Sequence, residues 1–182
     1  MSVLNNPATG AAAHADAYTR AILDALGTRD PLAVLRETPA RLRELTAGLS
    51  PEALSRPEAP GKWSIAGVVQ HLADSELVGG FRYRMVLAHD APEIMGFDQD
   101  LWAERLRYRD SDLEDALTDF TALRRYNLRL LTRATPEEMK RVMHHVERGE
   151  ESLAHMMRMY AGHDLVHLRQ VERVRKEVRS EK

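Results

Sequence analysis

The chain has 182 residues, of which 43% are hydrophobic and 30% charged, with a formal net charge of −2 and no cysteine. This size and balance are typical of one globular domain and lack the strongly basic character of nucleic-acid-binding proteins, so we expect no nucleic-acid partner. Without cysteine there is no disulfide and no thiolate ligand, so any bound metal must be held by His, Asp or Glu.

The N-terminal sequence has neither the basic start nor the apolar stretch of a secretory signal. No apolar run approaches the roughly 18 residues that a membrane-spanning helix needs. We therefore expect a cytoplasmic protein with no membrane partner.

Residues 1–13 are small and polar, and we expect a flexible N-terminus followed by one domain over residues 14–182. A short helix is predicted from about Ala15 to Leu26, ended by Gly27. The next segment, "DPLAVLRETPARLRELTAGLS", places leucines at helical spacing, which predicts a long helix. Pro31 fits its first turn, whereas Pro39 indicates either a kink or the start of a second helix.

A second long helix is expected after Ser64, which is a suitable N-cap residue, and continues into "FRYRMVLAH". Gly79 and Gly80 lie inside it, and such a destabilising pair indicates close approach by a neighbouring element. Further long helices are predicted at about 112–132 and 151–178. The connections 90–109 and 134–150 contain a helical turn near Trp102 but no strand-like alternation.

Four long helices without strands predict an all-α fold, a four-helix bundle with the short N-terminal helix added. The connections are longer than the 2 to 8 residues usual in simple bundles. A segment of this length can return along a helix of about 35 Å, so crossover connections and parallel neighbouring helices are allowed.

Two histidines lie four residues apart in the last predicted helix, in "YAGHDLVHLRQ". His163 and His167 project onto the same face as Met156 and Val171, whereas His155 projects onto the opposite face. Two buried imidazoles at this spacing can share one metal ion, or they can be core histidines with ordinary hydrogen bonds.

A third ligand would have to come from another segment. His71 lies beside the apolar face of the second long helix and can reach the bundle interior. His14 and His89 lack such a context, and we expect them at the surface. His144 and His145 precede the last helix, where they either line the mouth of a cavity or are solvated.

Charged residues also fall on apolar faces. Glu76 and Arg124 either form an ion pair across the core or extend to water, because a buried charge is costly unless it is paired. Asp164 lies near the inward face of the last helix. It is either an exposed acid or a group that orients a ligand imidazole.

Three segments, "GKWSIAGVVQHLADSE", "FDQDLWAERLRY" and "HVERGEESLAHMMRMYAGHDLVHLRQV", together resemble the DinB/YfiT-like superfamily over about residues 35–174. The resemblance implies a crossover four-helix bundle that binds nickel, zinc, iron or manganese through three histidines. The matching positions are His71, His163 and His167. His145, with Gly149 shortly after it, matches a family histidine outside the ligand set.

The resemblance also implies a putative metal-dependent enzyme that activates a low-molecular-weight thiol for transfer, or water. The alternatives are a metal-dependent hydrolase and a non-enzymatic stress protein that binds a metal or small molecule. Since the chain has no cysteine, the thiol would be a cosubstrate. We expect His145 or Glu76 to assist proton transfer, a small-molecule substrate or thiol as partner, and a homodimer as a plausible assembly.

Overall fold

The computed structural model describes residues 11–180 of the chain and the side chains of residues 17–177. The predicted flexible N-terminus therefore lies mostly outside the described residues, as does the side chain of His14. The first helix, α1, spans Ala11–Leu26, beginning four residues before the predicted start. It ends at Gly27 as expected, where φ is +57°, a left-handed value that glycine adopts without strain.

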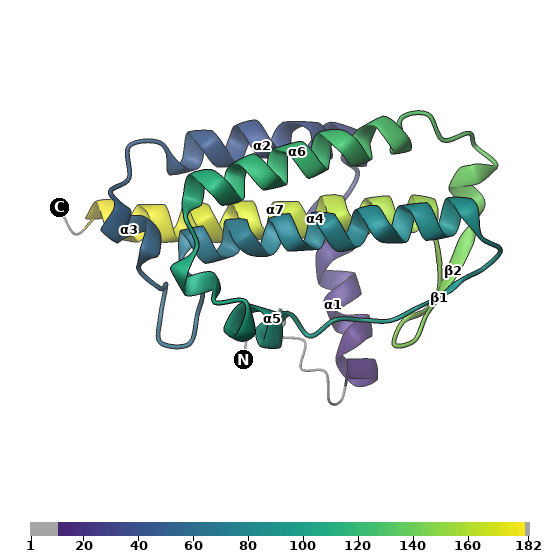
Figure 1. The fold of residues 1–182 in the computed structure, drawn as a ribbon, viewed down its shortest axis with the longest axis horizontal. Coiled ribbons are helices and arrows are strands. Elements are labelled where there is room, and N and C mark those ends of the chain that lie inside the picture. The colour runs from purple at the N-terminus through teal and green to yellow at the C-terminus, as the bar shows by residue number, and fades with distance from the viewer. Residues whose placement is uncertain (1–10, 181–182) are drawn as a thin grey trace.

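Four long helices form the bundle: α2 (Pro31–Thr46), α4 (Ile65–Ala88), α6 (Leu113–Leu131) and α7 (Leu153–Ser180) (Figure 1). The predicted four-helix bundle is confirmed, and the ends of α4, α6 and α7 lie within two residues of those predicted. Side-chain caps mark the starts of three helices: Asp30 before α2, Ser64 before α4 and Asp112 before α6 each accept hydrogen bonds from the first turn that follows.

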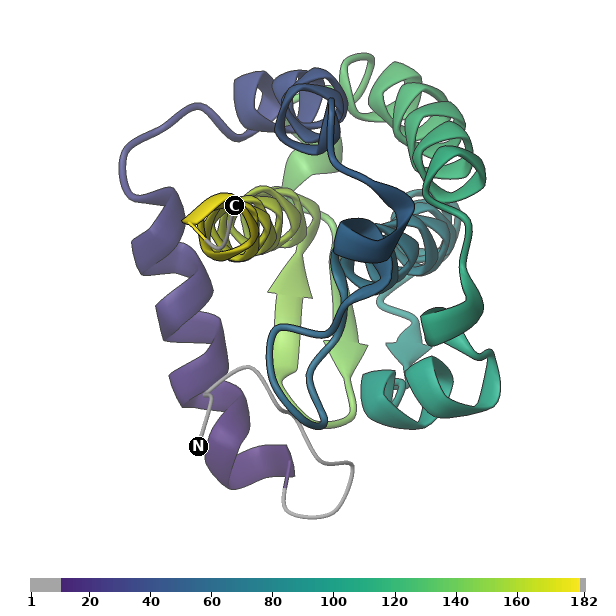
Figure 2. The same cartoon turned by 90° about the vertical axis from the view of Figure 1, so that its left-hand side faces the viewer.

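The end-on view shows the four helices at the corners of a square (Figure 2). Helix α2 packs against α6 and α7, and α4 packs against the same two helices. Helices α4 and α6 run in the same direction, so residues 89–112 return along the whole bundle (Figure 1). This is the expected crossover connection. Helix α1 packs on the outer side of α7.

Pro39 lies inside α2, so this segment is one helix with no second start. Proline has no N–H to donate to the carbonyl four residues earlier, which is that of Leu35. The side chain of Arg124 on α6 donates to this carbonyl oxygen at 2.8 Å. The proline is therefore tolerated because a side chain from another helix replaces the missing donor.

The prediction that the connections contain no strand was wrong. Three short strands, β1 (Glu93–Ile94), β2 (Val142–His145) and β3 (Gly149–Ser152), form one sheet in the order β1-β2-β3. Strands β1 and β2 are parallel, and β2 and β3 are antiparallel. Strands of two to four residues show no period of alternation in a sequence, and the parallel pair joins two separate connections.

Short helical segments also occupy the connections. They are α3 (Pro51–Ser55), α5 (Gln99–Arg105) and two 3₁₀ turns, η1 (Tyr108–Asp110) and η2 (Glu138–Lys140). Helix α5 confirms the turn expected near Trp102. Helix α3 begins the proline-rich segment "PEALSRPEAPGK", residues 51–62, which connects α2 to α4.

The two adjacent glycines of α4 lie at close helix contacts, as their positions indicated. A Cβ atom at Gly79 would lie 2.7 Å from the ring of Tyr160 on α7. A Cβ at Gly80 would clash with the amide of Asn127 on α6. Both positions therefore exclude a larger side chain because a neighbour fills the space.

The apolar core consists of two clusters that draw on opposite halves of α7. One includes Leu153, Met156 and Ala161, and the other includes Leu168 and Val171. Between these halves, α7 buries three polar side chains, those of His163, Asp164 and His167. Since buried polar groups are costly unless they have partners, this band is where a functional site is expected.

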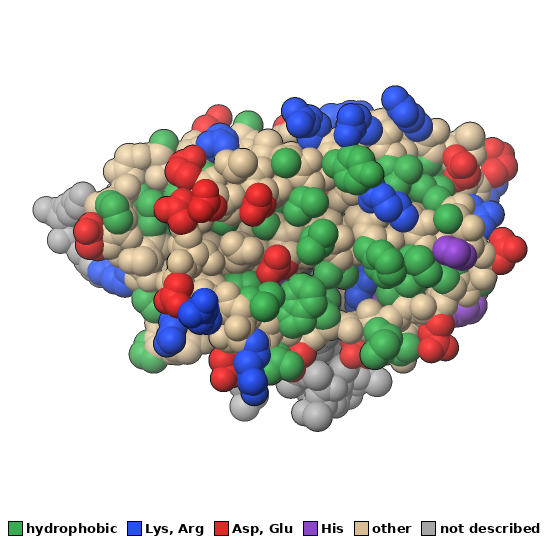
Figure 3. Space-filling view, viewed as in Figure 1, with side chains coloured by type: hydrophobic (Ala, Val, Ile, Leu, Met, Phe, Trp, Pro, Cys, Tyr) green, Lys and Arg blue, Asp and Glu red, His purple; other side chains and the backbone are tan. Residues whose placement is uncertain are grey.

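The face in Figure 3 carries charges of both signs and several neighbouring apolar side chains. Exposed apolar residues include Leu77 and Phe81 on α4 and Tyr126 on α6. Within residues 11–180, every helix is too short or too polar to cross a membrane.

Candidate metal centre

Three buried histidines converge from two helices. His71 lies on α4, and His163 and His167 lie one turn apart on α7. The Nε2 atom of His163 is 3.0 Å from Nε2 of His71 and 3.1 Å from Nε2 of His167. One ligand atom from each residue lies within 4.8 Å of the others. The structure thus brings together all three residues predicted as metal ligands.

These distances fit a shared cation better than a hydrogen-bond network. A neutral imidazole has one N–H, so the Nε2 atom of His163 cannot serve both neighbours with good geometry. Nitrogen ligands about 2.1 Å from one ion would lie about 3.0 Å apart at right angles and about 3.4 Å apart at tetrahedral angles. The observed separations lie at the short end of this range, so the donor set fits a divalent metal.

Gln170 sets the proton position on His167. The Nδ1 atom of His167 is 2.9 Å from Oε1 of Gln170, and an amide oxygen only accepts. The proton of a neutral His167 ring is therefore on Nδ1, which leaves the Nε2 lone pair facing the other histidines. Trp63 packs beside this centre, with its ring 4.6 Å from that of His71.

Burial keeps these rings neutral. It lowers the pKa of His71 and of His163 well below the usual 6.5, and neighbouring histidines add to the effect. Burial also lowers the pKa of His167 to about 4. At neutral pH all three rings can therefore offer nitrogen lone pairs, the form in which histidine binds metals.

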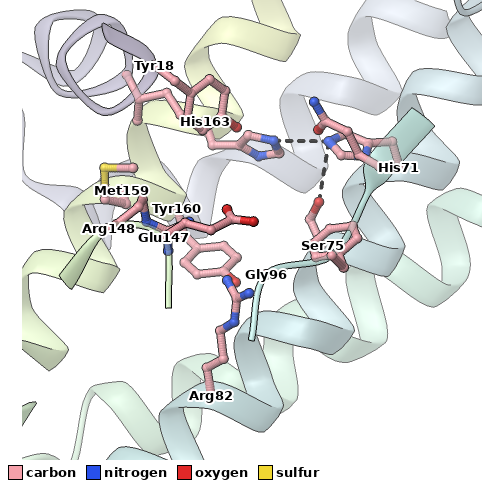
Figure 4. A pocket seen from close by; sticks show the side chains of 13 residues that line it. Tyr18, His71, Ser75, Arg82, Gly96, Glu147, Arg148, Met159, Tyr160 and His163 are labelled. Atoms are coloured by element: carbon pink, nitrogen blue, oxygen red, sulfur yellow. Dashed lines mark hydrogen bonds between the residues drawn. The ribbon is translucent and has the colours of Figure 1, made fainter. Parts of the chain in front are cut away.

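A cavity opens beside His71 and His163 (Figure 4). Its walls combine apolar side chains with a few polar groups, as small-molecule sites do. The lining comes from α1, α4, α7, the connection after β1 and the β2–β3 turn, and comprises Tyr18, Ile22, His71, Ser75, Arg82, Gly96, Phe97, Gln99, Glu147, Arg148, Met159, Tyr160 and His163. The Ser75 hydroxyl lies 3.4 Å from Nε2 of His71.

A buried ion-pair network lies next to the histidines. The guanidinium of Arg124 is 2.8 Å from a carboxylate oxygen of Glu76 and 2.6 Å from one of Asp164. Burial alone would lower the pKa of Arg124, but the two carboxylates raise it, so the guanidinium stays charged. Of the two alternatives for Glu76 and Arg124, the structure shows the ion pair across the core. Asp164 is neither an exposed acid nor bonded to an imidazole, because it faces Arg124 instead.

The two residues predicted to assist proton transfer lie outside the cavity lining. Glu76 is bound to Arg124 and also accepts from the side chain of Asn127 at 2.9 Å. His145 is buried on β2, and its Nδ1 atom accepts from the backbone N–H of Glu147 at 3.2 Å. His89 and His144 are exposed. The roles predicted for Glu76 and His145 remain predictions.

The cavity also contains polar residues that the sequence did not single out. Glu147 and Arg148 come from the turn between β2 and β3, while Arg82 comes from α4. Their side chains line one cavity because the parallel pairing of β1 and β2 places this hairpin near the bundle. No local sequence signal marks such a contact.

The structural class of this protein is a crossover four-helix bundle in which three buried histidines converge beside a cavity. Residues 34–171 match the DinB superfamily, and the chain belongs to that family. The resemblance found in the sequence segments is thereby confirmed.

Relatives in two species share most of the length. A Bacillus licheniformis protein named as a "putative metal-dependent hydrolase" is 32% identical over 145 residues, covering 78% of this chain and 81% of the relative. The "Putative metal-dependent hydrolase YfiT" of Bacillus subtilis is 28% identical over 136 residues, covering 74% and 76%.

A solved structure of YfiT from Bacillus subtilis has a similar fold. It superposes with a TM-score of 0.72 at 26% identity and covers 79% of this chain and 84% of that chain. It is described as a probable metal-dependent hydrolase with an unusual four-helix bundle topology. This agrees with the four-helix bundle seen here.

Proposed function

We propose that this protein is a metal-dependent enzyme in which His71, His163 and His167 hold a divalent ion and the adjoining cavity binds a small-molecule substrate. One observation carries the proposal: three neutral imidazole nitrogens converge, and two of them belong to residues that line a cavity. The metal-dependent names of the relatives support it.

The reaction class follows from the ligand set. Three histidines leave coordination positions open, as in catalytic sites, and a divalent ion there supplies a Lewis acid that lowers the pKa of a thiol or water. A low-molecular-weight thiol would attack an electrophile, giving an S-transferase, or water would do so, giving a hydrolase. The thiol has to be a cosubstrate, since the chain has no cysteine.

The residues of the chain would bind and orient the reactants. Gln170 fixes the ring of His167, and the buried rings exclude water from the centre. Glu76 and His145, the two residues predicted to assist proton transfer, do not line the cavity. The carboxylate of Glu147 does. We therefore add Glu147 as a candidate proton acceptor.

Elemental analysis of the purified protein tests the metal centre. The wild type should contain nickel, zinc, iron or manganese near one equivalent, and His167→Ala should contain almost none. The matched control is His144→Ala, because His144 is exposed and is not among the residues that line the cavity. Normal metal content in His167→Ala would overturn the ligand assignment.

A second measurement separates the possible activities. The metal-loaded protein is titrated with bacillithiol, mycothiol and glutathione and then assayed with an electrophile and, separately, with ester and amide substrates. Thiol-dependent transfer would support the transferase, and turnover without thiol would support the hydrolase. Binding without turnover would favour the non-enzymatic stress protein. The cytoplasmic location and the homodimer also remain predictions, to be tested by fractionation and light scattering.

A further inference from the structure

Arg82 is a buried cation in the wall of the cavity. Its side chain comes from α4 and is only 6% exposed. One guanidinium nitrogen, Nη2, donates to the backbone carbonyl of Met95 at 2.9 Å, and the guanidinium also interacts with the hydroxyl of Tyr160. The Nε atom is buried without a hydrogen-bond partner. The close-up shows the guanidinium beside the ring of Tyr160 and the chain at Gly96 (Figure 4).

The other buried arginines near the site differ in having carboxylate partners. Arg124 is paired with Glu76 and Asp164, and the Nε atom of Arg148 is 2.5 Å from Glu151. Within residues 17–177, no carboxylate lies in an ion pair with Arg82. Burying a charge without an opposite charge is costly, so this guanidinium is suited to an anionic ligand.

Arg82 shares one face of α4 with the metal-ligand candidate His71. Both residues line the cavity, and Ser75 lies between them on the same wall. Eleven residues of α-helix rise about 16 Å, and helical side chains tilt toward the N-terminus, which brings the guanidinium toward His71. A short ligand can therefore contact both ends of the cavity.

The cavity lining contains two guanidinium groups, those of Arg82 and Arg148, and one carboxylate. The only carboxylate among the described lining residues is Glu147, and its oxygens point into the space between His163 and Ser75 (Figure 4). It forms no ion pair with Arg82. Its carboxylate lies against Gly96, one residue from the Met95 carbonyl that binds Arg82, but is not in an ion pair with the guanidinium, so the unpartnered Nε of Arg82 is left for an anionic ligand.

We propose that the cavity takes a small ligand bearing a carboxylate, which Arg82 binds through its guanidinium while the rest of the ligand extends toward the three histidines. Arginine suits this task because its planar fork donates two parallel hydrogen bonds to one carboxylate. The extension of the ligand toward the three histidines rests on the proposed function, whereas carboxylate binding by Arg82 does not.

The test compares carboxylates with neutral molecules of the same shape. Straight-chain monocarboxylates from acetate to hexanoate, each beside its amide, are titrated into the metal-free and the zinc-loaded full-length protein by calorimetry. We expect at least one carboxylate to bind about tenfold more tightly than its amide in both forms, since hydrogen bonds between charged groups are the stronger kind. The metal-free protein is decisive because no metal competes there for the carboxylate.

Variants test whether the preference for carboxylate over amide depends on Arg82. Arg82→Met should remove the difference between carboxylate and amide, and Arg82→Lys should retain part of it. Arg125→Met is the matched control, because Arg125 is exposed on α6 and outside this cavity. It should bind both probes like the wild type.

An NMR measurement makes the test independent of the stability of the variants. The Nε–H resonance of Arg82 in the wild type should shift when the best carboxylate saturates the protein. Equal affinities for carboxylate and amide in the wild type, an unchanged preference in Arg82→Met, or an unmoved Arg82 resonance would each overturn the proposal. A protein that binds no metal but prefers carboxylates would refute the proposed function and leave the role of Arg82 intact.

Discussion

Arg124 donates a hydrogen bond to the carbonyl oxygen of Leu35, the helical carbonyl that Pro39 leaves without its usual donor. The same guanidinium binds Glu76 and Asp164, so one side chain connects α2, α4, α6 and α7. All four helices of the bundle therefore meet at a single charged group beside the histidines.

Replacing this arginine should strongly destabilise the fold. Arg124→Met leaves two buried carboxylates and the Leu35 carbonyl without their partner, and we expect the free energy of unfolding to fall by about 3 to 5 kcal/mol. Denaturant unfolding followed by circular dichroism measures the loss. Arg125→Met, at an exposed neighbouring position, should change stability by less than about 0.5 kcal/mol. A loss below that value for Arg124→Met would contradict a structural role for the network.

Gln170 should matter for metal affinity more than for folding. Gln170→Ala removes the acceptor that holds the proton of His167 on Nδ1, and we expect metal to bind about 10 to 100 times more weakly. Competition with a chromophoric chelator gives the affinity. Gln70→Ala serves as the control, because the side chain of Gln70 contacts Asp74 and not a histidine. Equal metal affinities of Gln170→Ala and Gln70→Ala would contradict the orienting role of Gln170.

Gly162 should be intolerant of a methyl group. A Cβ atom there would clash with the backbone carbonyl of Ile22, so Gly162→Ala should push α1 away from α7. We expect a loss of about 1 to 3 kcal/mol in thermal or denaturant unfolding, typical of overpacking. The same substitution at Gly67, whose nearest contact is at 3.4 Å, should be neutral or stabilising because alanine is the better helix former. Similar stability of both variants would refute the close contact.

His145 should make stability depend on pH. Burial, aided by Arg148 and Arg82, lowers the pKa of His145 from 6.5 to about 4. Between these values the unfolded chain binds a proton that the folded protein does not, so the free energy of unfolding falls as the pH drops from 6.5 toward 4. Urea titrations across this range should show a shallower fall for His145→Gln than for the wild type. His144→Gln should follow the wild type, and an unchanged slope in His145→Gln would contradict the prediction.

The sequence predicted most of the helical framework because its signals are local. Ser64 and Asp112 cap the helices that follow them, and the spacing of apolar residues gives each buried face. The same spacing placed His163 and His167 inward. The choice of His71 as third ligand came from the family resemblance, because periodicity alone left its direction open.

The tertiary structure alone decided the composition of the cavity and of the charged network. Asp164 has Arg124 as its partner because α6 and α7 bring them together across the interior. Glu147 reaches the cavity through a hairpin whose strands are too short to show a pattern. Only the folded structure shows that Arg82 lies in the cavity wall and forms no ion pair within residues 17–177. Local periodicity fixes which way a side chain faces on its own helix. Which group it meets depends on contacts between residues far apart in the chain, and these exist only once the helices have packed.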